Sequence, residues 1–530
     1  MNRPNRLLEA ATAAVFTLAV FALAGITCAQ NEPAPPNSQG NQTQDLAPAG
    51  YVPVEQYNEL KQEVEALKAR LDTDEKRLPA TQPGLPSGNA TNTTTVAGQY
   101  PAVQAAPISG EQPGALQLAP SLDEPIKSLF APRTQDEYFS PFSIMNPAGM
   151  RPDMNLEIAR YQDMHLYIGL DTVGRFQFLH QANVDVKGVD QGGINPGFQT
   201  PFADLNFLAT IPGKLDVYFD SYIASRPHPS TTYGHEGYMV FKGLPAPFDT
   251  GGFKQLFDYI NVKVGAFDLD FGDQNYRRSN NAIVSRNPLI GNAIVDPNVE
   301  EIGGEVYSIK GPIYMLAGLG SGTTTEHFDF GPEPGVHGKV WGYPLPDLRT
   351  SISGYYANLS NSSTAFEDTN LFAASRSGGV YAGVFQGGDS PGQITPAAGK
   401  DVTAVQGDAT WNHWPFEIYS NVGWTSDSSY EERWTYGTVE PVYHITPALY
   451  VAARYSVAVA GAVNGVDSNG WGDRIQIGGG YFFTENLLAK MEYVFQQYHN
   501  FAAEDGLVSG VDAARDPRFD GVVMEVSFSF

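Results

Sequence analysis

The stretch Gly521-Val522-Val523-Met524-Glu525-Val526-Ser527-Phe528-Ser529-Phe530 decides the fold of this chain. Every second residue from Val522 to Phe530 is apolar, while the residues between them are mostly small or polar. A period of two places successive side chains on opposite faces of an extended strand. This segment is therefore predicted to be a β-strand with one apolar face.

The same alternation recurs in segments further upstream. The predicted apolar faces are Leu487, Ala489, Met491, Tyr493 and Phe495; Ile475, Ile477, Gly479, Tyr481 and Phe483; Leu449, Val451, Ala453, Tyr455 and Val457; and Leu215, Val217 and Phe219. In water an apolar face needs a protein core to pack against. In a closed barrel that spans a membrane it faces lipid, and the polar face lines a lumen. The pattern predicts an all-β fold, a transmembrane antiparallel β-barrel.

Short turns and long polar connections alternate along this part of the chain. Tight turns are predicted at residues 210–213, 310–312, 344–347, 413–415, 446–447 and 484–486, with a somewhat longer one at 243–256. Long connections are predicted at 271–298, 321–335, 358–401, 460–472 and 499–518. A membrane barrel has short turns at one end and long loops at the other. We count about sixteen strands between Val173 and Phe530, or eighteen if residues 164–169 or 380–385 add to the wall.

The composition excludes several classes of protein. The 530 residues include 58 acidic and 32 basic side chains, for a net charge of −26, so nucleic acid is not an expected partner. Mean hydropathy is −0.25, which excludes a bundle of membrane helices. The single cysteine excludes a disulfide scaffold and a thiolate metal cluster.

The N-terminus has the pattern of an export signal. Arg3 and Arg6 precede an apolar stretch at residues 10–26, and small residues at Thr27 and Ala29 offer a cleavage site. Residues 1–29 are therefore predicted to be a signal peptide. A retained membrane anchor and a lipoprotein acylated at Cys28 are the alternatives.

Three further segments precede the barrel. Residues 30–50 are predicted to be a disordered linker, and residues 79–160 a Pro/Gly-rich linker and lead-in to a barrel at 161–530. Residues 51–78 between the linkers are predicted to be a short α-helical coiled coil, or alternatively one amphipathic helix lying on another surface. Its seam has the spacing three, four, three, four and consists of Tyr57, Leu60, Val64, Leu67 and Leu71. The coiled coil implies a homotrimer.

At this point the sequence resembles the trimeric sixteen-stranded porins of bacterial outer membranes, most of all the phosphate-selective porin group. The stretches that carry the resemblance are 165–169 with 174–176 and 262–267 with 271–272, together with the N-terminal helix. The resemblance implies a passive channel in the outer membrane of a diderm bacterium, surrounded by lipid, whose third external loop folds into the lumen as a constriction. Phe528 and Phe530 resemble the signal that the barrel-assembly machinery recognises.

By the alternation of short and long connections, residues 271–298 form the third external connection, which is the expected constriction. It holds Arg277, Arg278 and Arg286. Wall positions predicted to face inward add the cations Arg175, Lys263, Arg349, Arg454, Arg474 and Lys490 and the carboxylates Asp216, Asp220, Glu492 and Glu525. This lining leans basic and predicts a weak preference for anions such as phosphate. The alternative is that the cations pair with carboxylates and only hold the loop in place.

No motif for catalysis, for a metal or for a cofactor is found in the sequence. The nine histidines are scattered, and Gly478-Gly479-Gly480 has neither the lysine nor the following helix of a phosphate loop. The first expectation is therefore a porin for small hydrophilic solutes and ions. The alternatives are a structural or adhesive barrel with a plugged lumen, an outer-membrane hydrolase, and a secreted β-sandwich protein.

Overall fold

The computed structural model describes most of the chain from residue 156 onward. The described residues are 117–118, 156–183, 185–186, 189–190, 196–199, 202–224, 233–244, 251–277, 279, 284–297, 300–311, 313–322, 335–358, 371–372, 380–385, 392–396, 399–463, 465–501 and 516–530. The predicted signal peptide, first linker and coiled-coil seam, with Cys28, lie outside these residues, and so does Arg278.

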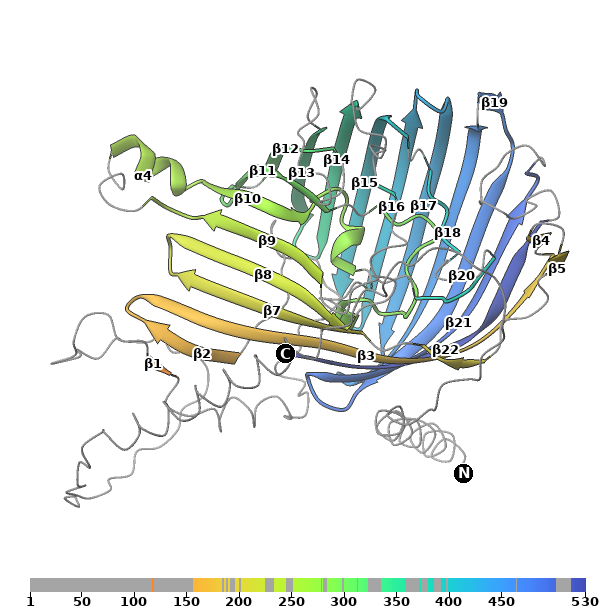
Figure 1. Ribbon diagram of the computed structural model, residues 1–530, viewed down its shortest axis with the longest axis horizontal. Coiled ribbons are helices and arrows are strands. Elements are labelled where there is room, and N and C mark those ends of the chain that lie inside the picture. The colour runs from red at the N-terminus through yellow and green to blue at the C-terminus, as the bar shows by residue number, and fades with distance from the viewer. Residues whose placement is uncertain are drawn as a thin grey trace, which may run out of the picture. The chain divides into compact units, whose positions relative to one another are not determined.

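Sixteen strands form a closed antiparallel barrel (Figure 1). They are β3 (Met164–Ala182), β7 (Phe202–Ile211), β8 (Leu215–Ala224), β9 (Tyr233–Phe241), β10 (Ile260–Asp268), β11 (Glu300–Ser308), β12 (Ile313–Gly320), β13 (Gly335–Leu345), β14 (Leu348–Asn358), β15 (Asp401–His413), β16 (Phe416–Asp427), β17 (Glu432–His444), β18 (Leu449–Val463), β20 (Trp471–Phe482), β21 (Leu487–His499) and β22 (Arg518–Ser529). Each pairs with the next, and β22 closes the ring on β3, from Ser529 opposite Asp171 to Arg518 opposite Ala182. The predicted sixteen-stranded barrel is confirmed, and the lumen is enclosed on all sides.

The two segments that would have given eighteen strands are not additional wall strands. Residues 164–169 are the first residues of β3 itself. Residues His165 to Val173 of β3 pair with β7, so they already belong to the wall. Residues 380–385 form no strand and lie buried or half-buried inside the barrel. The sequence count therefore began the first wall strand about nine residues too late.

Shorter elements accompany the barrel. They are β1 (Gln117–Leu118), β2 (Leu156–Tyr161), β4 (Asp185–Val186), β5 (Val189–Asp190), β6 (Gly197–Phe198), β19 (Val466–Asp467), the helix α4 (Gly251–Phe257) and the 3₁₀ turns η1 (Gln274–Arg277) and η2 (Val284–Arg286). Strand β2 pairs with residues 164–168 of β3, on the same edge of β3 that pairs with β22 from Asp171 to Ala182. Within the described part of the chain, no helix is both long and apolar enough to span a bilayer.

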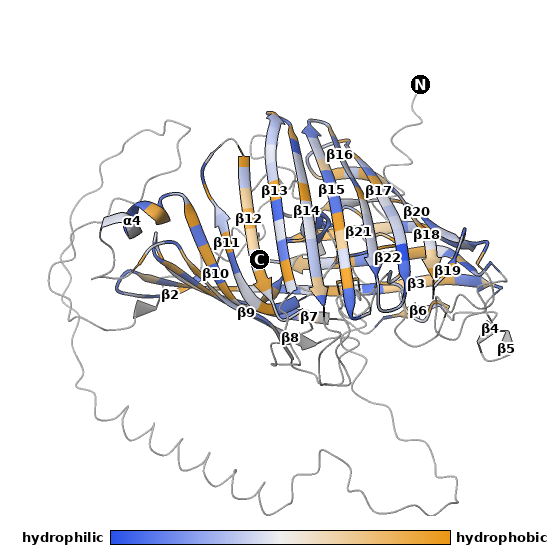
Figure 2. Ribbon diagram, turned by 90° about the horizontal axis from the view of Figure 1, so that it is seen from above, coloured by the Kyte–Doolittle hydropathy of each residue, from blue (hydrophilic) through white to orange (hydrophobic). Residues whose placement is uncertain are grey.

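The two faces of the wall differ as the alternation predicts. Apolar side chains on the outer face stay exposed, for example Ile352 at 65%, Val422 at 62% and Met491 at 58%. Their neighbours on the inner face, such as Ser353 and Glu492, are almost fully buried. Figure 2 shows apolar and polar residues alternating along the strands. The outward and inward assignments made from sequence for β8, β18, β20, β21 and β22 are confirmed.

Two glycines allow the wall to bend. Gly265 in β10 has φ +145°, and a Cβ there would lie 2.3 Å from the Gly237 carbonyl oxygen. Gly521 in β22 has φ +152°, and a Cβ would lie 2.1 Å from the Phe178 carbonyl oxygen. Only glycine fits such a close approach between paired backbones.

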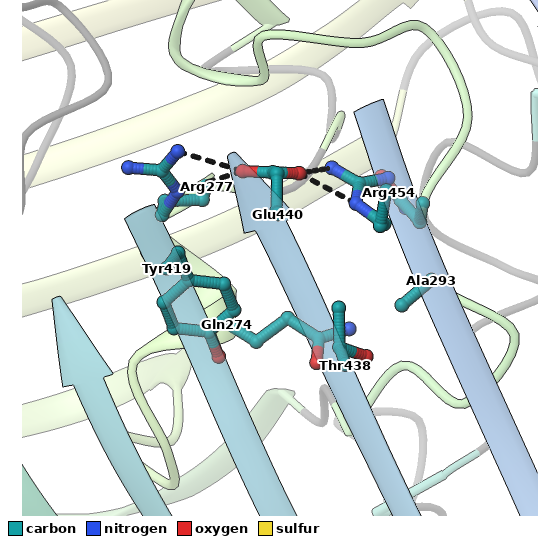
Figure 3. A pocket seen from close by; sticks show the side chains of 8 residues that line it. Gln274, Arg277, Ala293, Tyr419, Thr438, Glu440 and Arg454 are labelled. Carbon is teal, nitrogen blue, oxygen red and sulfur yellow. Dashed lines mark hydrogen bonds and ion pairs between the residues drawn. The ribbon is translucent and has the colours of Figure 1, made fainter. Parts of the chain in front are cut away.

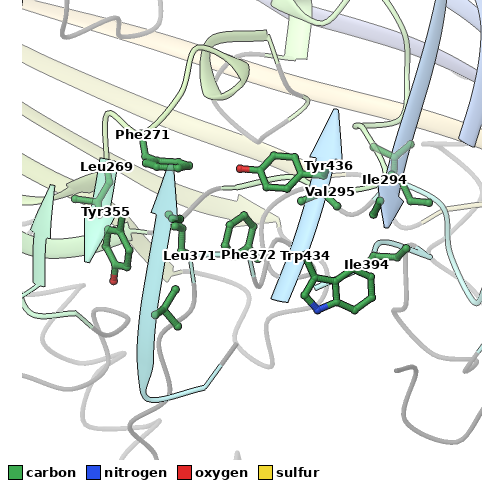
Figure 4. Packing of buried hydrophobic residues seen from close by; sticks show 14 of the residues in the cluster. Leu269, Phe271, Ile294, Val295, Tyr355, Leu371, Phe372, Ile394, Trp434 and Tyr436 are labelled. Atoms are coloured by element: carbon green, nitrogen blue, oxygen red, sulfur yellow. The ribbon is translucent and has the colours of Figure 1, made fainter. Parts of the chain in front are cut away.

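The hydrophobic core lies inside the barrel. Inward wall residues such as Tyr355, Trp434 and Tyr436 pack with residues from two long connections, including Phe271 and Phe372 (Figure 4). A barrel of sixteen strands is too wide for wall side chains alone to fill. The connections supply the remaining atoms, and these connections form the candidate site.

Candidate functional site

The connection between β10 and β11 folds into the lumen. It runs from residue 269 after β10 to residue 299 before β11, and we call it the third connection. Almost every described residue of it is buried, from Leu269 through Arg277 and from Arg286 through Pro297. The inward fold that the resemblance implied for this loop is therefore present in the described residues.

Asp273 fixes the first part of the third connection to the wall. Its carboxylate accepts hydrogen bonds from Arg349 Nη2 at 2.8 Å and from Ser351 Oγ at 3.0 Å, and it lies 2.7 Å from Lys339 Nζ. Burial would raise the pKa of Asp273, but the charges of Lys339 and Arg349 outweigh burial and lower it. Two cations on neighbouring strands thus hold one loop carboxylate.

Asp270 forms a second contact near the start of the connection. Lys263 Nζ lies 3.3 Å from the Asp270 carboxylate and 2.6 Å from the Glu305 carboxylate. The Tyr276 hydroxyl donates a hydrogen bond to Asp270 as well. Burial would raise the pKa of Asp270, but Lys263 and Lys339 lower it to about 2. The same ammonium of Lys263 stands 4.0 Å above the Phe267 ring.

Arg277 reaches across the lumen to the opposite wall. It donates to Glu417 on β16 and, at 2.6 Å from Nη2, to Glu440 on β17. Glu440 also accepts from Arg454 of β18, so one carboxylate bridges two guanidinium groups (Figure 3). Arg277, Glu440 and Arg454 line a small pocket, together with Gln274, Asn292, Ala293, Tyr419 and Thr438.

The second part of the connection binds the wall mainly through its backbone. Glu492 accepts the Ile290 and Gly291 amides at 2.7 and 3.0 Å, and Ser456 accepts the Ile294 amide at 3.0 Å. Arg474 donates to the Asn292 carbonyl at 2.8 Å. The backbone of this part of the connection is irregular and has no neighbouring strand to pair with. Side chains of the wall supply the hydrogen-bond partners that its amide and carbonyl groups need.

The remaining expected site residues are placed as follows. Lys490 donates to the Asn287 and Leu289 carbonyls at 3.3 and 3.2 Å, and it shares the Glu525 carboxylate with Arg175. Arg286 is buried in η2. All expected site cations that the structure describes therefore lie inside the barrel, and most of them contact a carboxylate or the third connection.

Phe528 and Phe530 extend from the end of β22, with ring centroids 5.7 Å apart. The Phe530 backbone pairs with Leu170 on β3 through two hydrogen bonds of 3.1 Å. Their expected recognition by the assembly machinery stays a prediction.

The expected basic lining is wrong for the described residues. Sixteen aspartates and glutamates are buried against nine lysines and arginines. Several of these acids were not considered from the sequence, namely Asp171, Asp204, Glu301, Glu305, Asp408, Glu417, Asp427 and Glu440. The alternation of polar residues in β16 and β17 could have placed Glu417 and Glu440 on the inner face, because both occupy the inward phase of their strands.

A second connection also enters the lumen, which the sequence did not indicate. Residues 380–385 and 392–396 of the connection between β14 and β15 lie against the inner wall and the third connection. Among the residues that the structure describes, no group of three or more His, Cys, Asp or Glu side chains is placed to hold a metal ion.

No family model matches the chain, and no curated protein matches it. Among solved structures, the outer-membrane channel DcaP of Acinetobacter baumannii is 12% identical, with a TM-score of 0.43 over 69% of this chain and 97% of that one. The anion-selective porin from Comamonas acidovorans is 11% identical, with a TM-score of 0.43 over 69% of this chain and 100% of the other. OmpT, an outer-membrane protein of Vibrio cholerae, is 10% identical, with a TM-score of 0.42 over 70% and 99%. The fold assigned to this chain rests on its own strand pairing.

Proposed function

We propose that the protein is an outer-membrane porin, a passive channel for small hydrophilic solutes and ions. The observation that carries this proposal is the closed sixteen-stranded wall with an apolar exposed face outside and a charged face inside. In water such an outer face would drive association, whereas in a bilayer it is the stable arrangement. A barrel of sixteen strands is wide enough for an aqueous path that loops then narrow.

The lining supports a preference for cations rather than the anion preference expected from the sequence. Arg277 and Arg454 already share Glu440, and Arg349 is held by Asp273, so these guanidinium groups are engaged with protein carboxylates. The buried carboxylates are in excess over the buried cations among the described residues. Fixed charge in a low-dielectric tube sets the sign of the ions that enter it.

A structural barrel with a plugged lumen is the second candidate. Inward side chains on every side of the wall are buried, including Asp204, Glu301, Thr410 and Glu525. A wide water-filled lumen would leave many of them exposed. The interior of the barrel is thus largely occupied by wall side chains and by connections between strands. In a porin these connections leave or open a path for solute, whereas in a plugged barrel they stay in place.

Planar-bilayer recording tests both candidates together. A porin gives discrete conductance steps, and a reversal potential under a salt gradient that favours cations would support the lining argument. A reversal potential that favours anions would contradict it. A full-length protein that gives no steps at any voltage would favour the plugged barrel instead.

Export, location and assembly belong to the same proposal. A cleaved signal peptide at residues 1–29 would deliver the chain to the envelope, and the barrel-assembly machinery would insert it. The seam from Tyr57 to Leu71 would hold three copies together as a homotrimer. Deletion of residues 51–78 is expected to slow trimer assembly, measured by cross-linking in detergent, without abolishing conductance.

A further inference from the structure

Two stretches of the connection between β14 and β15 lie inside the barrel and carry no charge. They are residues 380–385 and 392–396, which we call the lumen strip; their side chains are Val, Tyr, Ala, Val, Phe, Gln, Ile, Thr and Pro, with two glycines. Val380, Tyr381, Val384, Phe385 and Ile394 are almost fully buried. Most of the strip is thus buried, although Thr395 is exposed.

Neutral amide groups hold the strip to the wall. Gln177 of β3 donates to the Ala382 carbonyl at 2.8 Å and accepts the Ala382 amide at 2.9 Å. Gln181 of the same strand accepts the Phe385 amide at 2.9 Å. On the other side of the ring closure, Gln496 of β21 donates to the Gly392 carbonyl.

Aromatic contacts complete the attachment. The Phe385 ring packs on Tyr498 and Phe519 with centroids 5.2 and 5.3 Å apart. Phe385 has φ +62°, a backbone conformation that is costly for a bulky residue. Part of the packing energy therefore offsets backbone strain, and release of the strip would relieve that strain.

The third connection is held in a different way. Asp270, Asp273 and Arg277 form buried ion pairs with the wall. Separation of a buried ion pair leaves an uncompensated charge in the protein interior, whereas separation of a neutral hydrogen bond leaves only uncharged polar groups, which is less costly. Release of the third connection would break several such ion pairs, while release of the strip breaks none.

The strip also lies directly on the third connection. The Ile394 amide donates to the Ile294 carbonyl at 2.8 Å, and Gln393 donates to Asp296 at 3.1 Å. The Tyr381 hydroxyl donates to Glu492, the same carboxylate that holds the Ile290 and Gly291 amides. The strip therefore occupies space beside the fixed loop, where solute would have to pass.

From these contacts we infer that the lumen strip is the gate of the channel and that the third connection is its fixed frame. This inference rests on the proposed function. Opening consists of withdrawal of residues 380–385 and 392–396 from the wall of β3, β21 and β22, while residues 269–297 stay in place. The strip can leave without breaking an ion pair, and it loses hydrogen bonds such as those from Tyr381 to Glu492 and from Gln393 to Asp296. The amides of Gln177, Gln181 and Gln496 would then line the open path.

Thiol labelling tests which of the two loops moves. Val384 in the strip and Leu289 in the third connection are both aliphatic and at most 1% exposed, and the cluster that holds Leu289 contains no strip residue, so they form a matched pair. Val384→Cys and Leu289→Cys are each introduced into a full-length Cys28→Ala background, which has no other cysteine. In lipid vesicles, a water-soluble maleimide is expected to label Val384→Cys severalfold faster than Leu289→Cys. Equal protection of both thiols would overturn the gate.

Conductance provides the second measurement. Gln177→Ala with Gln181→Ala removes the amide contacts of β3 and is expected to raise the open probability severalfold relative to the unmodified chain. Thr425→Val is the control, because Thr425 is a buried inner-wall residue that bonds to the Thr403 carbonyl of the wall. Unchanged gating in the glutamine variant, in a protein that conducts, overturns the gate and leaves the porin proposal intact. If no variant conducts, the porin proposal fails, and the labelling rates still decide whether the strip moves.

Discussion

Arg349 Nη2 lies 2.8 Å from Asp273 Oδ1, and both side chains are fully buried inside the barrel. Arg349 belongs to the wall strand β14, whereas Asp273 lies just before η1 in the third connection, 76 residues earlier in the chain. Arg349 Nε also donates to the second oxygen of the Asp273 carboxylate, Oδ2, at 3.1 Å, so the contact is bidentate. A planar fork of this kind fixes orientation as well as distance. This pair therefore fixes the first part of the third connection against the inner wall.

Arg349→Ala is expected to lower the free energy of unfolding of the barrel by about 3–5 kcal/mol, because Asp273 would stay buried with one of its two cations. Arg349→Lys is expected to recover only part of the loss, since an ammonium cannot form the bidentate contact. Urea titration of the protein in vesicles, followed by tryptophan fluorescence, measures both changes. An alanine variant as stable as the unmodified chain would show that the pair does not hold the loop.

The wall could be read from the sequence because each strand carries its own signal. A period of two assigned Met491 outward and Glu492 inward, and no knowledge of partners was needed. The interior was harder, since its contacts join distant residues: Arg277 binds Glu417 and Glu440, which follow it by 140 and 163 positions. Arginine was recognised as a constriction residue, but its carboxylate partners were not assigned, and the lining was therefore given the wrong sign.

The lumen strip could not have been predicted in the same way. Residues 380–385 carry neither charge nor regular alternation, and the 358–401 connection was interpreted as an external loop. Its position depends on three glutamines, Gln177, Gln181 and Gln496, which on their own strands look like ordinary inward polar residues. A neutral segment that is held through its backbone amide and carbonyl groups has no characteristic residue pattern, so its position cannot be predicted from sequence.

Glu440→Gln is expected to shift the ion preference toward anions, because Arg277 and Arg454 would then share one carboxylate fewer. The reversal potential under a tenfold salt gradient is expected to move toward the anion limit. Asp467→Asn is the matched control, since Asp467 carries the same charge but is 91% exposed and pairs with Arg433 outside the core. A shift of equal size in both variants would assign the effect to surface charge.

The third connection is expected to stay in place at acidic pH. The pKa of Asp270 is held near 2 and that of Asp273 is lowered, against about 3.9 for an unfolded aspartate. A depressed pKa contributes stability above the unfolded value, and the contribution is lost as pH falls through the folded value. Protection of Leu289→Cys from the maleimide, after transfer to a common labelling pH, should therefore be unchanged by incubation between pH 7 and pH 4 and should fall only near pH 2–3. Loss of protection at pH 5 would show that these carboxylates do not anchor the loop.

The outer face offers a test of what surrounds the barrel. Ile352 lies in the middle of β14, is 65% exposed, and stands opposite Val340 and Gly407 on the neighbouring strands. If lipid covers this face, Ile352→Arg is expected to cost about 2–4 kcal/mol of folding free energy in vesicles, as at a bilayer midplane. Leu345→Arg is the matched control: Leu345 is 59% exposed but ends β13 at the rim, where the same change is expected to cost about 0–1 kcal/mol. In water an exposed isoleucine can be replaced by arginine at little cost, so equal small effects at both positions would show that hydrocarbon does not cover the middle of β14.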